Sequence, residues 1–127
     1  MNENDIAREI VDAAFKIHSA LGPGLVESVY EAILAHELKK RGLDAQRQVP
    51  IRLQWDGLLF DEAFRADLVV EEKVIVELKA LEVVPAIAKS KLLTYLRLAD
   101  KRLGLLLNFG DRFIKDGITR VVNGLEE

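Results

Sequence analysis

The sequence predicts a single mixed α/β (α+β) domain, residues 1–127, in which a mixed β-sheet is flanked by helices. Three observations lead to this prediction. A chain of 127 residues is long enough for one hydrophobic core but too short for two. Apolar residues recur at helical spacing before residue 42, whereas runs rich in valine, isoleucine and leucine follow. A helical segment then precedes another apolar run, as in a strand meander followed by a crossover helix.

Two helices are expected at the start of the chain, over about 4–21 and 26–41. Asn4 or Asp5 is available as the cap of the first helix. A glycine-proline-glycine break at 22–24 separates the two helices. The second should end at three basic residues followed by Gly42, because glycine is favoured just beyond a helix end.

Three strands are then expected, at about 46–55, 58–70 and 74–80. Pro50 makes the first an edge strand, since proline cannot donate a ladder hydrogen bond. The dipeptide at 56–57, Asp-Gly, is a strong hairpin signal. The second strand is expected to contain a bulge near 61–63.

A helix opened by Pro85 should follow and end near residue 100. Its candidate core positions are Ile87, Leu92, Tyr95, Leu96 and Leu98. The short apolar run 103–109 predicts a buried central strand, and 114–122 can add a terminal strand. The expected order is therefore α-α-β-β-β-α-β with a possible final β.

Two of the apolar runs each carry an acid, Asp67 and Glu77, where a water-avoiding strand should not have one. A buried carboxylate is costly unless another group compensates it. The polar stretch 71–73 indicates a tight hairpin loop, so the two strands should pair antiparallel. If the turn centres on Glu72, Asp67 lies opposite Glu77, with β-carbons roughly 4.5 to 5.5 Å apart. Two carboxylates at that separation make half of a cation site.

Alternation along the strand puts Lys79 on the face of Glu77, whereas Val76, Leu78 and Ala80 point to the opposite face. Asp67, Glu77 and Lys79 would then form one cluster. A solvated strand end with an internal Glu/Lys salt bridge explains the same spacing equally well. A register slip of one residue would destroy the cluster.

The composition limits which metal ligands and which partners the chain can have. Half of the residues are hydrophobic and 31% are charged, an ordinary globular balance. The chain has no cysteine, so a metal would be held by oxygen or imidazole, which favours Mg²⁺ or Mn²⁺. No run is long enough to span a membrane, and the polar start is unlike a secretory signal, so a cytoplasmic location and no membrane partner are expected. The net charge of −3 gives no support for non-specific nucleic-acid binding, although a subset of the basic residues could line a phosphate path.

The acid pair on a hairpin, followed by Glu77-Leu78-Lys79, resembles the signature of the PD-(D/E)XK nuclease superfamily, whose restriction-endonuclease-like core has an αβββαβ order. The stretch from about residue 10 to 125 resembles the GxxExxR protein family within it. The segments that carry this resemblance are 21–31, 65–68, 76–80, 92–96, 105–110 and 115–120. Two positions depart from the pattern: Tyr30 replaces the arginine of the family name, and Lys91 stands where related nucleases often carry glutamine.

The resemblance implies that Asp67 and Glu77 bind Mg²⁺ or Mn²⁺ with help from the main-chain carbonyl of Leu78. Lys79 would then position or help deprotonate the attacking water and stabilise the developing negative charge. Glu27 is the candidate extra carboxylate, although at the third helical position it could instead cap its own helix.

Five further side chains are candidates for supporting roles, and most have a structural alternative. His18 could touch phosphate or a metal-bound water, but a lone histidine on an apolar helix face is more often a core residue. Lys91 and Tyr95 share a helix face by their spacing and could contact substrate or orient the helix. For Tyr95, a packed aromatic ring with one satisfied hydroxyl is the commoner case. Asn108 and Arg120 could contribute to a phosphate pocket, and turn capping and surface pairing explain them as well.

The function expected from these residues is metal-dependent hydrolysis of phosphodiester bonds in nucleic acid, with DNA preferred over RNA. The alternative is a catalytically silent module that keeps the nuclease fold to bind nucleic acid or a protein partner. A third interpretation is that the acids hold a structural cation only. So small a chain also suggests a homodimer or a subunit of a larger complex.

Overall fold

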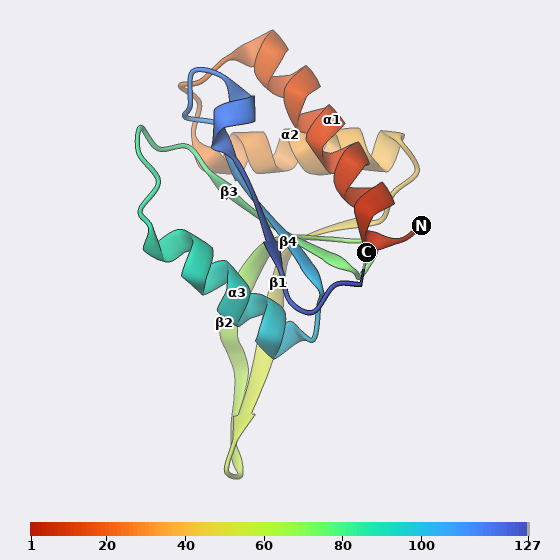
Figure 1. The fold of residues 1–127 in the computed structure, drawn as a ribbon, viewed down its shortest axis with the longest axis vertical. Coiled ribbons are helices and arrows are strands. Elements are labelled where there is room, and N and C mark those ends of the chain that lie inside the picture. The colour runs from red at the N-terminus through yellow and green to blue at the C-terminus, as the bar shows by residue number, and fades with distance from the viewer. Residues whose placement is uncertain (127) are drawn as a thin grey trace.

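The structure is a computed structural model that describes residues 1–126 (Figure 1). The predicted order is confirmed, and the possible terminal strand is present. The elements are α1 (Glu3–Leu21), α2 (Glu27–Lys40), β1 (Ala45–Trp55), β2 (Leu58–Val70), β3 (Val74–Lys79), α3 (Ile87–Ala99), β4 (Leu103–Asn108), the 3₁₀ turn η1 (Ile114–Gly117) and β5 (Ile118–Val122).

The five strands form one mixed sheet in the order β1-β2-β3-β4-β5. Only β3 and β4 are parallel, because α3 connects them as a crossover; the other neighbours are antiparallel. Helices α1 and α2 cover one face of the sheet and α3 covers the other (Figure 1). The sheet thus separates two apolar layers. β3 and β4 are interior strands, each with a neighbouring strand on both sides. None of the helices in residues 1–126 is long and apolar enough to cross a membrane.

The start of α1 differs from the prediction, because Asn2 and not Asn4 or Asp5 is the cap. The Asn2 side chain accepts a hydrogen bond from the Asp5 N–H at 2.9 Å, and the Asp5 carboxylate accepts one from the Asn2 N–H at 3.2 Å. This reciprocal capping box satisfies two backbone donors at once, which a cap at Asn4 could not do.

The start of α2 also differs, because Val26 is the cap and Glu27 is the first helical residue and not the third. The buried side chain of Tyr30 explains the late start. Its hydroxyl accepts a hydrogen bond from the Leu25 N–H at 3.2 Å and donates one to the Gly22 carbonyl at 2.5 Å. These bonds hold the glycine loop as a non-helical turn. Gly42 follows the helix end with a φ of 84°, as predicted.

The β1–β2 hairpin has the predicted turn and bulge. Asp56 and Gly57 have φ values of 46° and 83°, the left-handed conformations that a tight Asp-Gly hairpin turn requires. Ile51 pairs with Phe64 but Leu53 pairs with Phe60, so β2 has extra residues in the segment 61–63. β1 is an edge strand, as Pro50 indicated.

The helix α3 begins at Ile87, two residues after Pro85. Leu92 and Leu96 are fully buried under it as predicted, and Tyr95 and Leu98 are half-buried. The core assignment of Ile87 is wrong: its side chain is 57% exposed, because it stands in the first turn at the rim of a surface hollow.

Candidate active site

The pairing of β2 with β3 brings Asp67 and Glu77 together. Leu68 pairs with Val76 and Val70 with Val74, which is the predicted register about Glu72. Asp67 and Glu77 are the next two opposing residues beyond Leu68 and Val76, on the side away from the turn. The Asp67 N–H donates a hydrogen bond to Glu77 Oε1 at 3.3 Å, and the Leu78 N–H donates one to Asp67 Oδ2 at 2.9 Å. Each carboxylate therefore accepts a backbone hydrogen bond at the point where the β2–β3 pairing ends.

The side chain of Glu77 lies on the sheet face that α3 covers. Ile75, two residues earlier, packs in the layer under α3, whereas Val76 and Leu78 belong to the core under α1 and α2. Lys79 continues the face of Glu77, and both line a hollow of about 160 Å³ beside α3. The predicted alternation of the strand is thus confirmed.

Burial raises the pKa of Glu77 to about 8, and the negative charge of Asp67 adds to this effect. A side-chain hydrogen bond between the two carboxyl groups also favours the protonated form, whereas Lys79 acts in the opposite direction. The folded environment therefore favours the protonated form of Glu77 when no metal is bound. A divalent cation would compete with that proton for the same oxygens.

Glu27 is the first residue of α2, and its carboxyl group interacts electrostatically with Asp67 and Lys79. Its pKa is raised by burial first and by the charge of Asp67 second, while Lys79 lowers it. No side-chain hydrogen bond caps α2, so the capping alternative for Glu27 does not hold. Glu27 is within electrostatic range of Asp67 and Lys79, and it is not part of the hollow beside α3.

The two predicted α3 residues, Lys91 and Tyr95, line the hollow together with Glu77 and Lys79. The Tyr95 ring stacks on Phe64 of β2 with ring centroids 3.9 Å apart. Its pKa is raised by burial and then by the charges of Glu77 and Asp67. The aromatic contact expected for Tyr95 is therefore present. Its hydroxyl also lies within electrostatic range of the two acids.

Two residues next to the acids have no counterpart in the sequence analysis. Gln48 of β1 donates a hydrogen bond to Glu31 Oε1 at 2.7 Å and reaches Asp67 Oδ1 at 3.5 Å. Its φ is 53°, a conformation that a residue other than glycine adopts at a cost and that is often found near functional sites. Glu31 is only 4% exposed and forms a salt bridge with Arg47. The sequence signals for this pair were the polar residues at 46–48 and the place of Glu31 in the segment 21–31 that carries the family resemblance.

The remaining candidates have structural roles. His18 packs against Phe109, and its Nε2 lies 2.8 Å from the Asp111 carbonyl oxygen, so it contacts the loop after β4 and not the acids. Asn108 is 1% exposed and bonds both the N–H and the carbonyl of Leu81, which fixes the chain just beyond Lys79. Arg120 donates a hydrogen bond to Asn4 at 2.8 Å.

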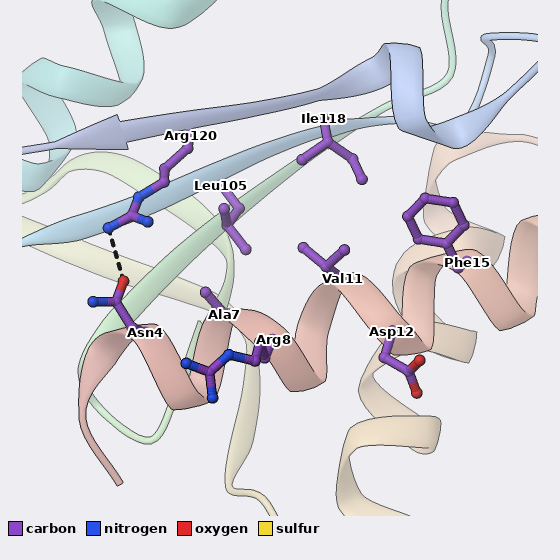
Figure 2. A pocket seen from close by; sticks show the side chains of 9 residues that line it. All are labelled: Asn4, Ala7, Arg8, Val11, Asp12, Phe15, Leu105, Ile118 and Arg120. Atoms are coloured by element: carbon purple, nitrogen blue, oxygen red, sulfur yellow. Dashed lines mark hydrogen bonds between the residues drawn. The ribbon is translucent and has the colours of Figure 1, made fainter.

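A larger hollow, of about 650 Å³, lies on the opposite face of the sheet between α1 and strands β4 and β5 (Figure 2). Its floor contains Ala7, Val11, Leu105 and Ile118, and charged side chains stand around it. None of the candidate acids lines it. Size therefore does not identify the reactive site; the position of the titratable groups does.

The donor set suits a hard divalent cation. Magnesium is commonly held by one or two carboxylates together with waters and substrate phosphate, and Asp67 and Glu77 supply two carboxylates. The N–H and C=O of one strand residue face the same side, so the Leu78 carbonyl points, like its N–H, toward Asp67. No group of three or more His, Asp or Glu residues close enough to hold a metal occurs within residues 1–126. Glu27 is consequently not close enough to Asp67 and Glu77 to bind the same cation directly with them.

Comparison with known proteins identifies the type of fold. The family model described as the PD-(D/E)XK nuclease superfamily matches residues 4–121. No sequence among the curated proteins matches. The crystal structure of SSO0001 is similar in fold, with a TM-score of 0.58 and 21% sequence identity. The superposition covers 79% of this chain and 52% of that one, so this chain spans about half of the length of SSO0001.

Proposed function

Because the chain belongs to the PD-(D/E)XK nuclease superfamily, we propose that it hydrolyses phosphodiester bonds of DNA with Mg²⁺ or Mn²⁺ as cofactor. The observation that carries this proposal is the meeting of Asp67 and Glu77 where the β2–β3 pairing ends, with Lys79 on the same face as Glu77. A module that only bound a partner would have no chemical need for a buried acid with a raised pKa beside a lysine. The narrower resemblance to the GxxExxR family remains a prediction.

Asp67, Glu77 and the Leu78 carbonyl would hold the cation, and Glu27 would contribute through a water molecule. When bound, the cation supplies Lewis acidity toward the phosphate and makes a coordinated water easier to deprotonate. Each acid keeps one carboxylate oxygen that accepts no backbone hydrogen bond, Oδ1 of Asp67 and Oε2 of Glu77. These oxygens would bind the metal, and at Asp67 Oδ1 the cation would share the oxygen with the Gln48 amide, which donates to it at 3.5 Å.

Lys79 would place the attacking water and stabilise negative charge that develops on the phosphate oxygens. In the reaction, the water oxygen bonds to phosphorus, one P–O ester bond breaks, and a proton reaches the leaving oxygen. Lys91 faces the same hollow and supplies a second positive charge for the scissile or a neighbouring phosphate. A lysine at this position can attract a phosphate by its positive charge as well as by hydrogen bonds, whereas a neutral glutamine could offer hydrogen bonds only.

The test is cleavage of linear, branched and single-stranded DNA and RNA in Mg²⁺, Mn²⁺ or EDTA. Wild type is compared with Asp67→Ala and Glu77→Ala, and Glu82→Ala serves as a matched control because Glu82 is an exposed acid three residues beyond Lys79. We expect metal-dependent cleavage of DNA that both site variants lose and the control keeps. Mn²⁺ affinity, measured by calorimetry, should fall in the same two variants.

Three results would change the proposal. Cleavage of RNA alone would replace the substrate but keep the reaction. Mn²⁺ binding and metal-dependent melting without cleavage of any substrate would identify a structural cation. Nucleic-acid binding that is independent of both acids, again without cleavage, would favour a silent binding module.

A further inference from the structure

The β1–β2 hairpin extends well beyond the rest of the molecule as a two-stranded arm (Figure 1). Near its base, Val49 and Ile51 pack against the core layer under α3. Further along β1, Leu53 and Trp55 continue the same alternation past the last packed position. The arm therefore carries an apolar stripe that begins inside the domain and emerges from it.

One face of the arm's end is apolar. Trp55 pairs with Leu58 and Leu53 pairs with Phe60, and residues two apart on a strand share a face, so these four side chains lie together. Trp55 is 70% exposed, Leu58 61% and Phe60 49%. The largest apolar patch on a typical monomeric protein is about 300 to 600 Å² and is often functional, so this contiguous group is a candidate interaction surface.

The charges on the arm favour a protein over a nucleic acid as the occupant. Between residues 49 and 66 the arm has two arginines, Arg52 and Arg65, and three acids, Asp56, Asp61 and Glu62. Arg52 already lies 3.4 Å from Asp61, and Arg65 pairs with Glu62. A surface that neutralised phosphates would need an excess of positive charge, which the arm lacks. Mixed signs around an apolar centre are instead typical of the rim of a self-complementary interface.

The exposed area is enough for a weak association with a second copy of the chain. An aromatic side chain offers about 150 to 250 Å², so the exposed parts of Trp55, Leu58 and Phe60 amount to roughly 400 Å² in each copy. Two such faces bury roughly 800 Å² together, which is below the size of a standard stable interface and suits a weak, concentration-dependent pair.

We propose that the apolar face formed by Leu53, Trp55, Leu58 and Phe60 packs against the same face of a second copy about a two-fold axis. The pairing would remove the exposed tryptophan from water. It depends on no property of those sites, so it stands or falls independently of the nuclease proposal.

Sedimentation velocity over a wide range of protein concentration provides the test. We expect wild type to shift from monomer to dimer at micromolar concentrations, and the double variant Trp55→Ser/Phe60→Ser to weaken association by about tenfold or more. Val83→Ser is the matched control, because Val83 is an apolar residue 78% exposed outside the arm. Circular dichroism should show all three proteins equally folded, since the replaced side chains are largely exposed.

A cross-link checks the geometry, because the chain has no cysteine of its own. Single Leu58→Cys protein should form a disulfide-linked dimer on mild oxidation, much faster than Ser19→Cys, which carries the thiol on the exposed side of α1. A monomer at every concentration would overturn the proposal, and so would a dimer that the double variant leaves intact. Loss of DNA affinity in the double variant, without any change in association, would assign the arm to nucleic acid instead.

Discussion

Replacement of Glu77 by glutamine should stabilise the metal-free protein, and the gain should grow with pH. The folded state raises the Glu77 pKa from 4.5 to about 8, so it favours the protonated carboxyl. The stability that this group contributes is fully present below pH 4.5 and is lost as pH rises toward 8. At 1.36 kcal/mol for each pKa unit, the loss is about 3 kcal/mol at pH 7 and approaches about 5 kcal/mol above pH 8.

Glutamine imitates the protonated acid and does not titrate. Its side-chain oxygen can still accept the Asp67 N–H, and its amide can donate to the Asp67 carboxylate. Urea unfolding in EDTA from pH 5 to 9 should therefore give a flatter stability profile for Glu77→Gln than for wild type, with the two curves converging at the acidic end. Glu82→Gln is the control, because an exposed acid should leave the profile unchanged.

Divalent metal should remove most of the stability advantage of the glutamine variant at pH 7. Mg²⁺ or Mn²⁺ binds the ionised pair, so saturating metal should stabilise wild type by about 3 kcal/mol at a hundredfold excess over the dissociation constant. Glu77→Gln lacks one ligand and should gain much less. Identical pH profiles for wild type and Glu77→Gln in EDTA would refute the reasoning, because Glu77 could not then be a buried acid that prefers its proton.

Three further predictions concern other residues. Lys79→Met should lower the cleavage rate by about a hundredfold or more while Mn²⁺ affinity, measured by calorimetry, changes little. Tyr30→Phe removes both hydrogen bonds to the glycine loop and should cost about 1 to 3 kcal/mol in urea unfolding, together with some activity. Gly110→Ala places a methyl group against the Leu81 backbone and should cost more than about 3 kcal/mol, whereas Gly104→Ala should cost less because a movable leucine side chain is its neighbour. Equal losses in the two glycine variants would contradict the steric argument.

The parts of the site that follow from local rules were predictable. Three polar residues at 71–73 and a period of two on each side fix which residues of β2 and β3 face each other, and the observed pairs follow that register. The burial of Glu77 follows from its five apolar or half-buried strand neighbours. Local composition was sufficient here because a short turn between two strands of alternating pattern sets the register by itself.

The contacts that sequence reasoning missed depend on single side chains and not on a repeating pattern. The bond from Gln48 to Glu31 links β1 to α2, and it depends on a left-handed backbone that no residue type at position 48 would indicate. The late start of α2 depends on a tyrosine hydroxyl three residues into the helix, which replaces the local capping box that Glu27 suggested. In both cases a specific side-chain hydrogen bond outweighs a local preference of about 1 kcal/mol.

The position of Glu77 explains why the fold can carry a destabilising acid at its centre. β3 lies between β2 and β4, and its pairing with β4 continues from Val74 to Lys79, past the point where its pairing with β2 ends. At Glu77, β3 is therefore still hydrogen-bonded to β4, whereas on the β2 side the ladder has ended and the carboxylates take its place. Asn108, at the end of β4, fixes the following segment through Leu81. If this support is what keeps the acids in place, Asn108→Ala should weaken Mn²⁺ binding more than an equally destabilising change in α1, because only the former loosens the end of β3.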